Sequence, residues 1–130
     1  MNNNKFLNTY KWPKNVPSLN KEMSDINNDF IHYWHKVLPK KYNIFENFNH
    51  KYPIKNAPPN FFKTLEIGAG NGEHLKYEKL TDIQKKNYYC IELREIMAND
   101  LINNFPFVNV IIGDCQKKLN FTDNYFDRII

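Results

Sequence analysis

The stretch Leu65-Glu66-Ile67-Gly68-Ala69-Gly70-Asn71-Gly72 decides the fold of this 130-residue chain. It closes a compact apolar run that begins at Phe62, so it marks the end of a buried strand and the start of a helix. Glycine serves such a turn in two ways. It permits positive φ angles, and it lacks the Cβ that would keep a ligand away from the main chain. A ligand bound there lies at the carboxyl ends of the strands.

The sequence after this stretch continues the alternation of strands and helices. We expect strands at residues 62–67, 88–93, 108–112 and 126–130, helices at 71–80 and 95–105, and a loop at 114–124. Strands that alternate with helices form a parallel sheet with right-handed crossovers. Strands that are apolar on both faces indicate a sheet covered on both sides. Residues 61–130 therefore predict an α/β fold, a Rossmann-like doubly wound parallel sheet.

Residues 1–60 form a separate, proline-rich zone with no strand pattern. One amphipathic helix is expected between Pro17 and Pro39, with Ser18 or Asn20 as its cap. Pro39 is expected to end it. Its apolar stripe consists of Leu19, Met23, Ile26, Phe30, Tyr33, Trp34 and Val37. Residues 40–60 predict a short helix at most, followed by an irregular connection.

The composition, with 42% hydrophobic and 25% charged residues, is typical of a globular domain. No apolar run approaches the ~20 residues of a membrane span. The N-terminus lacks the apolar core of a secretory signal, so a cytoplasmic location is expected. Cys90 and Cys115 fit no metal or disulfide spacing and are interpreted as reduced, largely buried thiols.

The net charge of +4 is unevenly distributed. Residues 1–62 carry nine lysines against four acidic residues, a balance of +5, whereas residues 63–130 have a balance of −1. A solvated basic surface is one interpretation, and an anionic small-molecule acceptor is the other. No arginine-rich stripe or recognition motif favours nucleic acid.

A glycine-rich turn also suits dinucleotides, but the spacing here argues against them. In the fingerprint G-x-G-x-x-G the third glycine would fall on Glu73, whereas the chain places it at Gly72. A carboxylate in the first helical turn would oppose a pyrophosphate there. S-adenosylmethionine has no phosphate, so it raises no such conflict.

Two further acidic residues follow strands. Glu92 ends the second expected strand, where a carboxylate can accept both hydroxyls of a ribose. Asp114 follows the third strand. Because the carboxyl ends of parallel strands open on one edge, we expect Glu66, Glu92 and Asp114 to converge there.

Over residues 61–130 the sequence resembles the class I S-adenosylmethionine-dependent methyltransferase superfamily. Glu66-x-Gly68-x-Gly70-x-Gly72 is similar to its first motif, Glu92 to its ribose-binding acid and Gly113-Asp114-Cys115 to its adenine-binding segment. Residues 119–130 are similar to the stretch that leads into the fourth strand of the small-molecule branch. The resemblance implies the cofactor-binding set Glu66, Gly68, Ala69, Gly70, Gly72, Glu92, Leu93, Asp114 and Cys115.

By this resemblance the chain is the cofactor-binding half of an enzyme that methylates a small molecule, with residues 1–60 as a helical lid. The glycine loop would hold the methionine part, and Asp114 would accept from the adenine amino group beside the Cys115 amide. A nicotinamide-dependent oxidoreductase domain and a non-catalytic S-adenosylmethionine-binding module are the alternatives. The sequence identifies no catalytic base.

The chain stops inside the fourth strand, so these residues alone are not expected to form a complete catalyst. Residues 126–130 are expected to be poorly ordered, paired with another molecule, or continued by further sequence, and self-association through this edge is one outcome. His32 and His35 lack a third metal ligand, and His74 is interpreted as a helix-surface residue. Four aromatic residues are interpreted as packing on the sheet or lining an acceptor pocket: Tyr10, Trp12, Tyr33 and Trp34.

Overall fold

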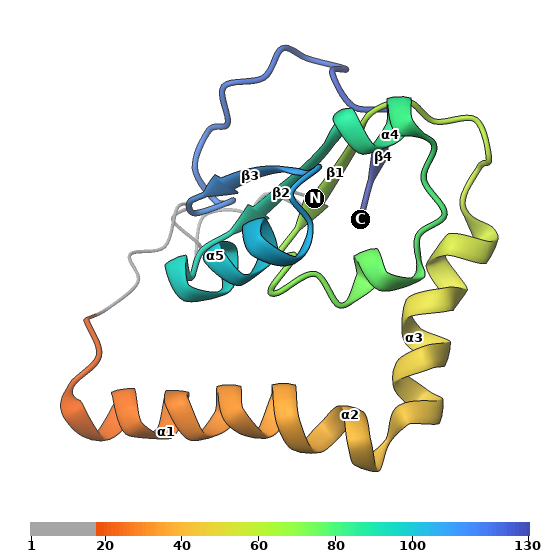
Figure 1. Ribbon diagram of the computed structural model, residues 1–130. Coiled ribbons are helices and arrows are strands. Elements are labelled where there is room, and N and C mark those ends of the chain that lie inside the picture. Colours follow the sequence, from red (N-terminus) through yellow and green to blue (C-terminus); the bar gives the residue numbers. More distant parts are fainter. Residues whose placement is uncertain (1–17) are drawn as a thin grey trace, which may run out of the picture.

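A computed structural model describes residues 18–130 of the chain (Figure 1). Four parallel strands form one sheet in the order β3-β2-β1-β4. The strands are β1 (Thr64–Ile67), β2 (Tyr88–Glu92), β3 (Asn109–Ile112) and β4 (Arg128–Ile129). This confirms the predicted α/β fold, and the order 3-2-1-4 is that of the first half of a doubly wound nucleotide-binding sheet.

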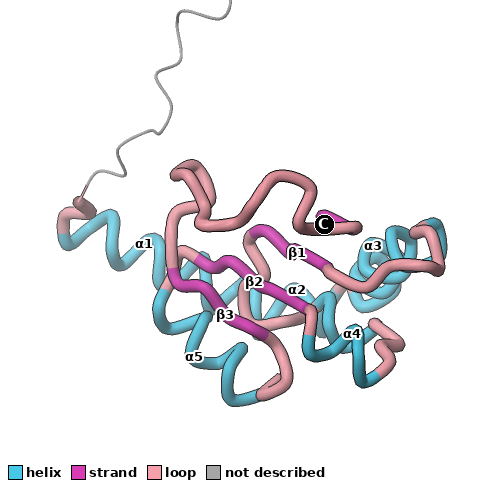
Figure 2. The backbone as a smooth tube through the Cα atoms, turned by 90° about the horizontal axis from the view of Figure 1, so that it is seen from above, coloured by secondary structure: helices cyan, strands magenta, loops and turns pink. Residues whose placement is uncertain are grey.

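One face of the sheet is covered by a helix, and the N-terminal helices lie beyond it (Figure 1). The helices and helical turns are α1 (Lys21–His32), the π-helical turn η1 (Tyr33–Val37), α2 (Leu38–Lys41), α3 (Asn43–Asn56), the 3₁₀ turn η2 (His74–Tyr77), α4 (Asp82–Lys86) and α5 (Glu95–Asn104). Viewed from above, α5 lies on one side of the strands and the loop over residues 113–127 on the other (Figure 2). No helix within residues 18–130 combines the length and apolar character of a membrane span.

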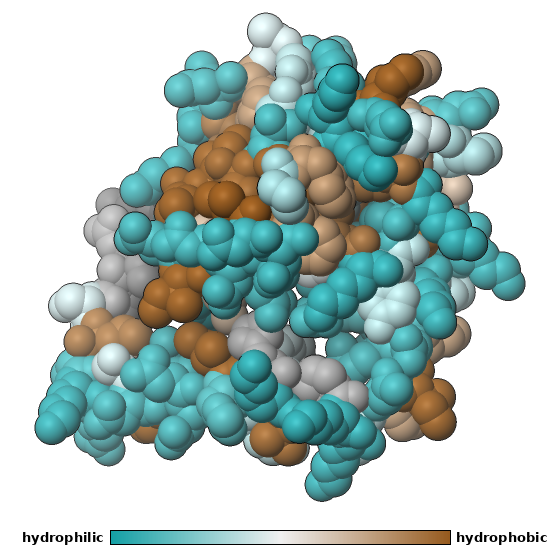
Figure 3. Space-filling model, viewed as in Figure 1, coloured by the Kyte–Doolittle hydropathy of each residue, from teal (hydrophilic) through white to brown (hydrophobic). Residues whose placement is uncertain are grey.

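The core lies between the sheet and the side that carries η2 and α5. Its buried members are Ala69, Leu75, Tyr88, Cys90 and Leu101. Aromatic residues cover the opposite face, where Tyr89 makes edge contacts with Phe121, Tyr125 and Phe126 of the long loop. In Figure 3 the visible face of α1 is mainly hydrophilic, and hydrophobic residues gather over the sheet layer.

The first helix begins where the sequence predicts it but does not end there. Asn20 is its cap, because its side chain accepts a hydrogen bond of 2.8 Å from the Met23 amide. The expected stop at Pro39 is wrong. The Leu38 amide bonds to the Tyr33 carbonyl five residues back, a π-type turn. Pro39 then falls in the first turn of α2, where its missing N–H breaks no intrahelical bond.

The second correction concerns residues 40–60, for which at most a short helix was expected. The structure has the 14-residue helix α3, with Pro53 inside it. None of its residues is buried, so the helix lacks the buried apolar stripe on which the sequence analysis relies.

A third correction concerns residues 71–80, which form the four-residue turn η2 and no α-helix. Gly70 and Gly72 have φ angles of +58° and +86°, which a right-handed helix does not allow, so no α-helix can begin before residue 73. The unpredicted helix α4 follows instead. It begins with a capping box, in which Thr81 and Gln84 satisfy each other's backbone amides.

The chain's last residues pair within the molecule. The Ile67 amide donates to the Ile130 carbonyl, and the Ile130 amide donates to the Leu65 carbonyl, each at 2.9 Å. Residues 126–130 are thus neither left without a partner strand nor dependent on another molecule for one. The outer edge of β4 has no neighbour among the described strands, and self-association through it stays a prediction.

Candidate functional site

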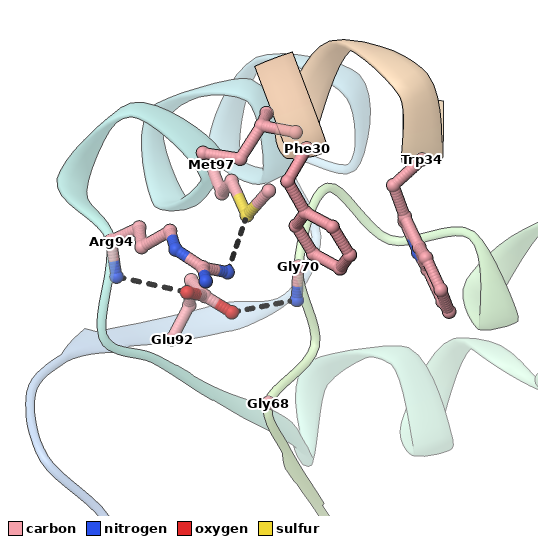
Figure 4. A pocket seen from close by; sticks show the side chains of 8 residues that line it. Phe30, Trp34, Gly68, Gly70, Glu92, Arg94 and Met97 are labelled. Carbon is pink, nitrogen blue, oxygen red and sulfur yellow. Dashed lines mark hydrogen bonds between the residues drawn. The ribbon is translucent and has the colours of Figure 1, made fainter. Parts of the chain in front are cut away.

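A cleft opens at the carboxyl ends of β1 and β2, between the glycine loop and α1 (Figure 4). It has a volume of about 210 Å³. A second cavity of about 270 Å³ adjoins it toward the end of β3 and shares Gly68, Glu92 and Arg94 with it. Together they have the size of a small-ligand site, and they lie next to the point where the strand order reverses between β1 and β4.

Glu92 is the polar centre of this cleft. Its side chain is buried at the end of β2. One carboxylate oxygen, Oε2, accepts from the Gly70 amide at 2.9 Å, and the other, Oε1, accepts from the Arg94 amide at 2.9 Å (Figure 4). A carboxylate offers about four acceptor positions, so two remain for a ligand. These two positions suit a pair of neighbouring hydroxyl groups.

Gly68 and Gly70 line the cleft with bare backbone. Both have positive φ, +74° and +58°, and a Cβ built on either would meet no atom within 4 Å. The space beside them is therefore open to a ligand that approaches the main chain.

Gly72 and Ala69, two other residues of the predicted cofactor-binding set, contribute to packing. A Cβ on Gly72 would lie 2.5 Å from Cε2 of Phe105 and 2.7 Å from Cδ1 of Leu101, so this glycine lets the loop sit against α5. Ala69 is part of the buried core. Neither lines the cleft.

Glu66 does not converge with Glu92 and Asp114, contrary to the expectation from the sequence. It lies inside β1, one residue before the strand ends, and its side chain enters the core. Tyr88 donates a hydrogen bond of 2.9 Å to its Oε2, and Cys90 Sγ lies 3.9 Å away. Burial raises the pKa of Glu66, and the Tyr88 hydrogen bond offsets only part of this effect. Its role is to join strands rather than to face the cleft.

Asp114 and Cys115 lie where the sequence places them, with Leu93, in the second cavity. The Gln116 amide donates to Oδ1 of Asp114 at 2.9 Å, which holds the carboxylate at the mouth of the loop. Cys115 is exposed, so the expectation of a buried thiol is wrong for it and right for Cys90. The difference arises because Cys90 lies in a central strand and Cys115 in a loop.

The wall opposite the glycine loop comes from α1 and α5. Phe30 and Trp34 extend from α1 and η1, and Met97 extends from α5 (Figure 4). Ile31 of α1 also lines the cleft. Trp34 was considered from the sequence, and Tyr10 and Trp12 lie outside the described residues. Arg94 and Met97 were missed. Arg94 follows Glu92 by only two residues, so its closeness to the acidic strand end is a signal that could have identified it; its Nη1 lies 3.7 Å from Sδ of Met97.

A buried polar network lies behind the site. His74, interpreted as a surface residue, is 7% exposed, and its Nε2 lies 3.1 Å from Oε1 of Glu78. Nη2 of Arg128 lies 2.8 Å from the same oxygen, and Nε of Arg128 donates to Thr64 Oγ1. Burial would raise the pKa of Glu78, but His74 and Arg128 outweigh it and lower that pKa. The network connects η2, which follows the glycine loop, to β1 and β4.

Comparison with solved structures matches the chain to S-adenosylmethionine-dependent methyltransferases. The plantazolicin methyltransferase BpumL, crystallised with a pentazolic substrate analogue and SAH, is 18% identical; the match covers 85% of this chain and 41% of that one, with a TM-score of 0.46. A methyltransferase from Clostridium acetobutylicum is 19% identical, with coverages of 80% and 42% and a TM-score of 0.48.

A TehB-like methyltransferase from Corynebacterium glutamicum is also 19% identical, with coverages of 82% and 54% and a TM-score of 0.49. The chain thus spans between two fifths and just over half of the length of these three proteins. No protein-family model matches the sequence, and no curated protein matches it either.

Proposed function

We propose that this chain forms the cofactor-binding half of an S-adenosylmethionine-dependent methyltransferase that acts on a small molecule. The observation that carries the proposal is the buried carboxylate of Glu92, which the amides of Gly70 and Arg94 hold in place at the floor of the cleft. Its two remaining acceptor positions fit the ribose hydroxyls of an adenosyl group.

The other residues of the cleft fit the same cofactor. Gly68 and Gly70 leave room along the backbone for the methionine part. Asp114 and the Cys115 amide, in the adjoining cavity, suit the adenine ring. Phe30, Trp34 and Met97 provide the apolar wall that a ligand without phosphates needs.

The loop geometry disfavours the dinucleotide alternative. A pyrophosphate binds at the N-terminus of an α-helix that follows the glycine turn. Here a four-residue 3₁₀ turn follows, and Glu73, which precedes it, already pairs with Lys76 at 2.6 Å. The loop thus offers no α-helical N-terminus to a pyrophosphate.

The chemistry proposed is a direct displacement. S-adenosylmethionine, when bound, supplies an electrophilic methyl group on a cationic sulfur. Glu92 and the glycine loop orient this group, and the aromatic residues of α1, as part of the proposed helical lid of residues 1–60, exclude water from the cleft. An acceptor with an anionic group remains the proposed substrate class, in keeping with the basic balance of residues 1–62.

Calorimetry on the full chain with S-adenosylhomocysteine and with NADH tests the proposal. We expect binding of the former and none of the latter. Tight NADH binding without a response to S-adenosylhomocysteine contradicts it. Binding without methyl transfer, when the chain is assayed within its longer gene product against a panel of acceptors, would favour the non-catalytic module.

A further inference from the structure

A groove lies far from the cofactor cleft, at the amino ends of the strands. It has a volume of about 820 Å³ and lies between the C-terminal half of α3 and the segment from η2 to α4. Phe61, which precedes β1, and Gln84, which precedes β2, line it, and it shares no residue with the cleft at Glu92. Figure 1 shows α3 standing beside the sheet at the side that carries α4.

Three lysines line this groove from its two walls. Lys51 and Lys55 lie one turn apart on the same face of α3, and Lys79 follows η2 on the other wall. None of the three forms an ion pair with a carboxylate within residues 18–130. Lys51 Nζ lies 5.5 Å from the ring centre of Tyr77, which holds its charge at the groove surface.

The acidic residue in the lining does not neutralise these lysines. Glu78 pairs with Arg128 and His74 inside the wall, and its side chain is 3% exposed. Arg128 in turn is fixed by Thr64 and by the ring of Phe61, whose centre lies 3.7 Å from the guanidinium carbon. Glu78 is therefore already paired inside the wall, and it leaves the charge of the three lysines uncompensated.

Two lysines that lie near the groove but do not line it, Lys76 and Lys85, pair with Glu73 and Asp82 at 2.6 and 3.0 Å, so their charges are already matched. A nucleic acid backbone needs a longer basic track than three lysines provide. Three lysines that line one groove of metabolite size from both walls suit a compact, multiply charged anion.

We propose that the groove lined by Lys51, Lys55 and Lys79 is a binding site for a phosphate-bearing small molecule, separate from the cofactor cleft. The site does not depend on the proposed methyltransferase function. Occupation would connect α3, and with it the N-terminal helices, to the η2–α4 segment of the core. Because the bound anion would neutralise charges on both walls, it would stabilise the packing of α3 beside the core.

The test is a titration of the ¹⁵N-labelled full chain with pyrophosphate at low ionic strength, followed by amide chemical shifts. We expect the largest shifts at residues of the groove walls. The variant Lys51→Gln/Lys55→Gln/Lys79→Gln should bind at least about tenfold more weakly. The control Lys21→Gln/Lys36→Gln/Lys117→Gln, which removes the same charge at exposed sites elsewhere, should change the affinity by less than about twofold.

Equal weakening in both triple variants would overturn the proposal, since it would mean nonspecific attraction to a basic surface. So would shifts centred on the Glu92 cleft. A single-stranded RNA decamer serves as the second probe. If the RNA binds at least tenfold more tightly than pyrophosphate and loses affinity in the control variant as well, the surface is an extended polyanion site and the small-molecule assignment is wrong. Circular dichroism of both variants confirms that they are folded.

Discussion

The carboxylate of Glu92, at the end of β2, accepts a hydrogen bond from the amide of Gly70, 2.9 Å away in the loop that follows β1. This contact joins the two segments that the sequence analysis identified independently, a glycine turn and an acidic strand end. It also holds the carboxylate of Glu92 in the lining of the cleft (Figure 4).

Glu92→Ala should therefore weaken binding of S-adenosylhomocysteine by about 1–3 kcal/mol, or about 5- to 150-fold in Kd, because ribose hydroxyls would lose their partner. Isothermal titration calorimetry measures this. Glu95→Ala, which removes an exposed carboxylate in the first turn of α5, is the matched control. An unchanged Kd in the Glu92 variant would place the ribose elsewhere.

Gly72→Ala should lower the free energy of unfolding by about 1–3 kcal/mol, because the new methyl group would overlap Phe105 and Leu101 at a backbone angle of +86°. Gly113→Ala is the control, since its Cβ meets nothing within 4 Å and its φ is not positive. Urea denaturation compares the two. Equal stability of the two variants would show that the loop can move away from α5 at no cost.

The sequence predicted the strands and α5 well because each is a continuous apolar run or a stripe with a buried face. β2 and α5 match their expected ranges to within one residue. The N-terminal helices were less predictable for a physical reason. α3 buries none of its residues, so its length depends on backbone hydrogen bonds that leave no apolar pattern in the sequence.

At the site, strand ends were predictable and side-chain directions were not. Glu92 and Asp114 lie where parallel-sheet geometry requires them. Glu66 pairs with Cys90 inside the sheet, one residue before β1 ends. This one-residue difference places its side chain in the core and not in the cleft. Arg94 and Met97 needed the path of the loop and helix after β2, which no local pattern specifies.

Glu66→Gln should make stability less dependent on pH on the acid side. Burial raises the pKa of Glu66 above its ordinary value of 4.5, so the folded chain binds a proton that the unfolded chain has released. The contribution of Glu66 to the free energy of unfolding therefore falls as pH rises from about 4.5 to the raised pKa. Thermal melts of both proteins over this window should show the decrease in the wild type and a smaller one in the variant. Parallel curves would contradict the assignment.

Asp127→Ala should destabilise the junction of β1 and β4. Oδ2 of Asp127 accepts from the amides of Phe62 and Lys63 at 2.9 and 2.8 Å, and these hydrogen bonds lower its pKa. This stabilisation is present above the ordinary pKa of 3.8 and is lost as pH falls through the lower, folded-state value. The variant should thus have a lower Tm at neutral pH and a difference from wild type that shrinks in strong acid. Asp123→Ala, in the preceding loop, is the control.

Trp34 should report on ligand binding by its fluorescence. Its side chain lines the cleft beside Phe30 and is 50% exposed, so a ligand in the cleft changes its solvent contact. The chain has two tryptophans, and Trp12→Phe leaves Trp34 as the single emitter. Saturating S-adenosylhomocysteine should shift and intensify that emission, because water is displaced from the indole. The variant Trp12→Phe/Trp34→Phe, which has no tryptophan, is the control for changes that do not come from Trp34. A silent Trp34 in a chain that calorimetry shows to be saturated would mean that α1 and η1 do not cover the bound cofactor.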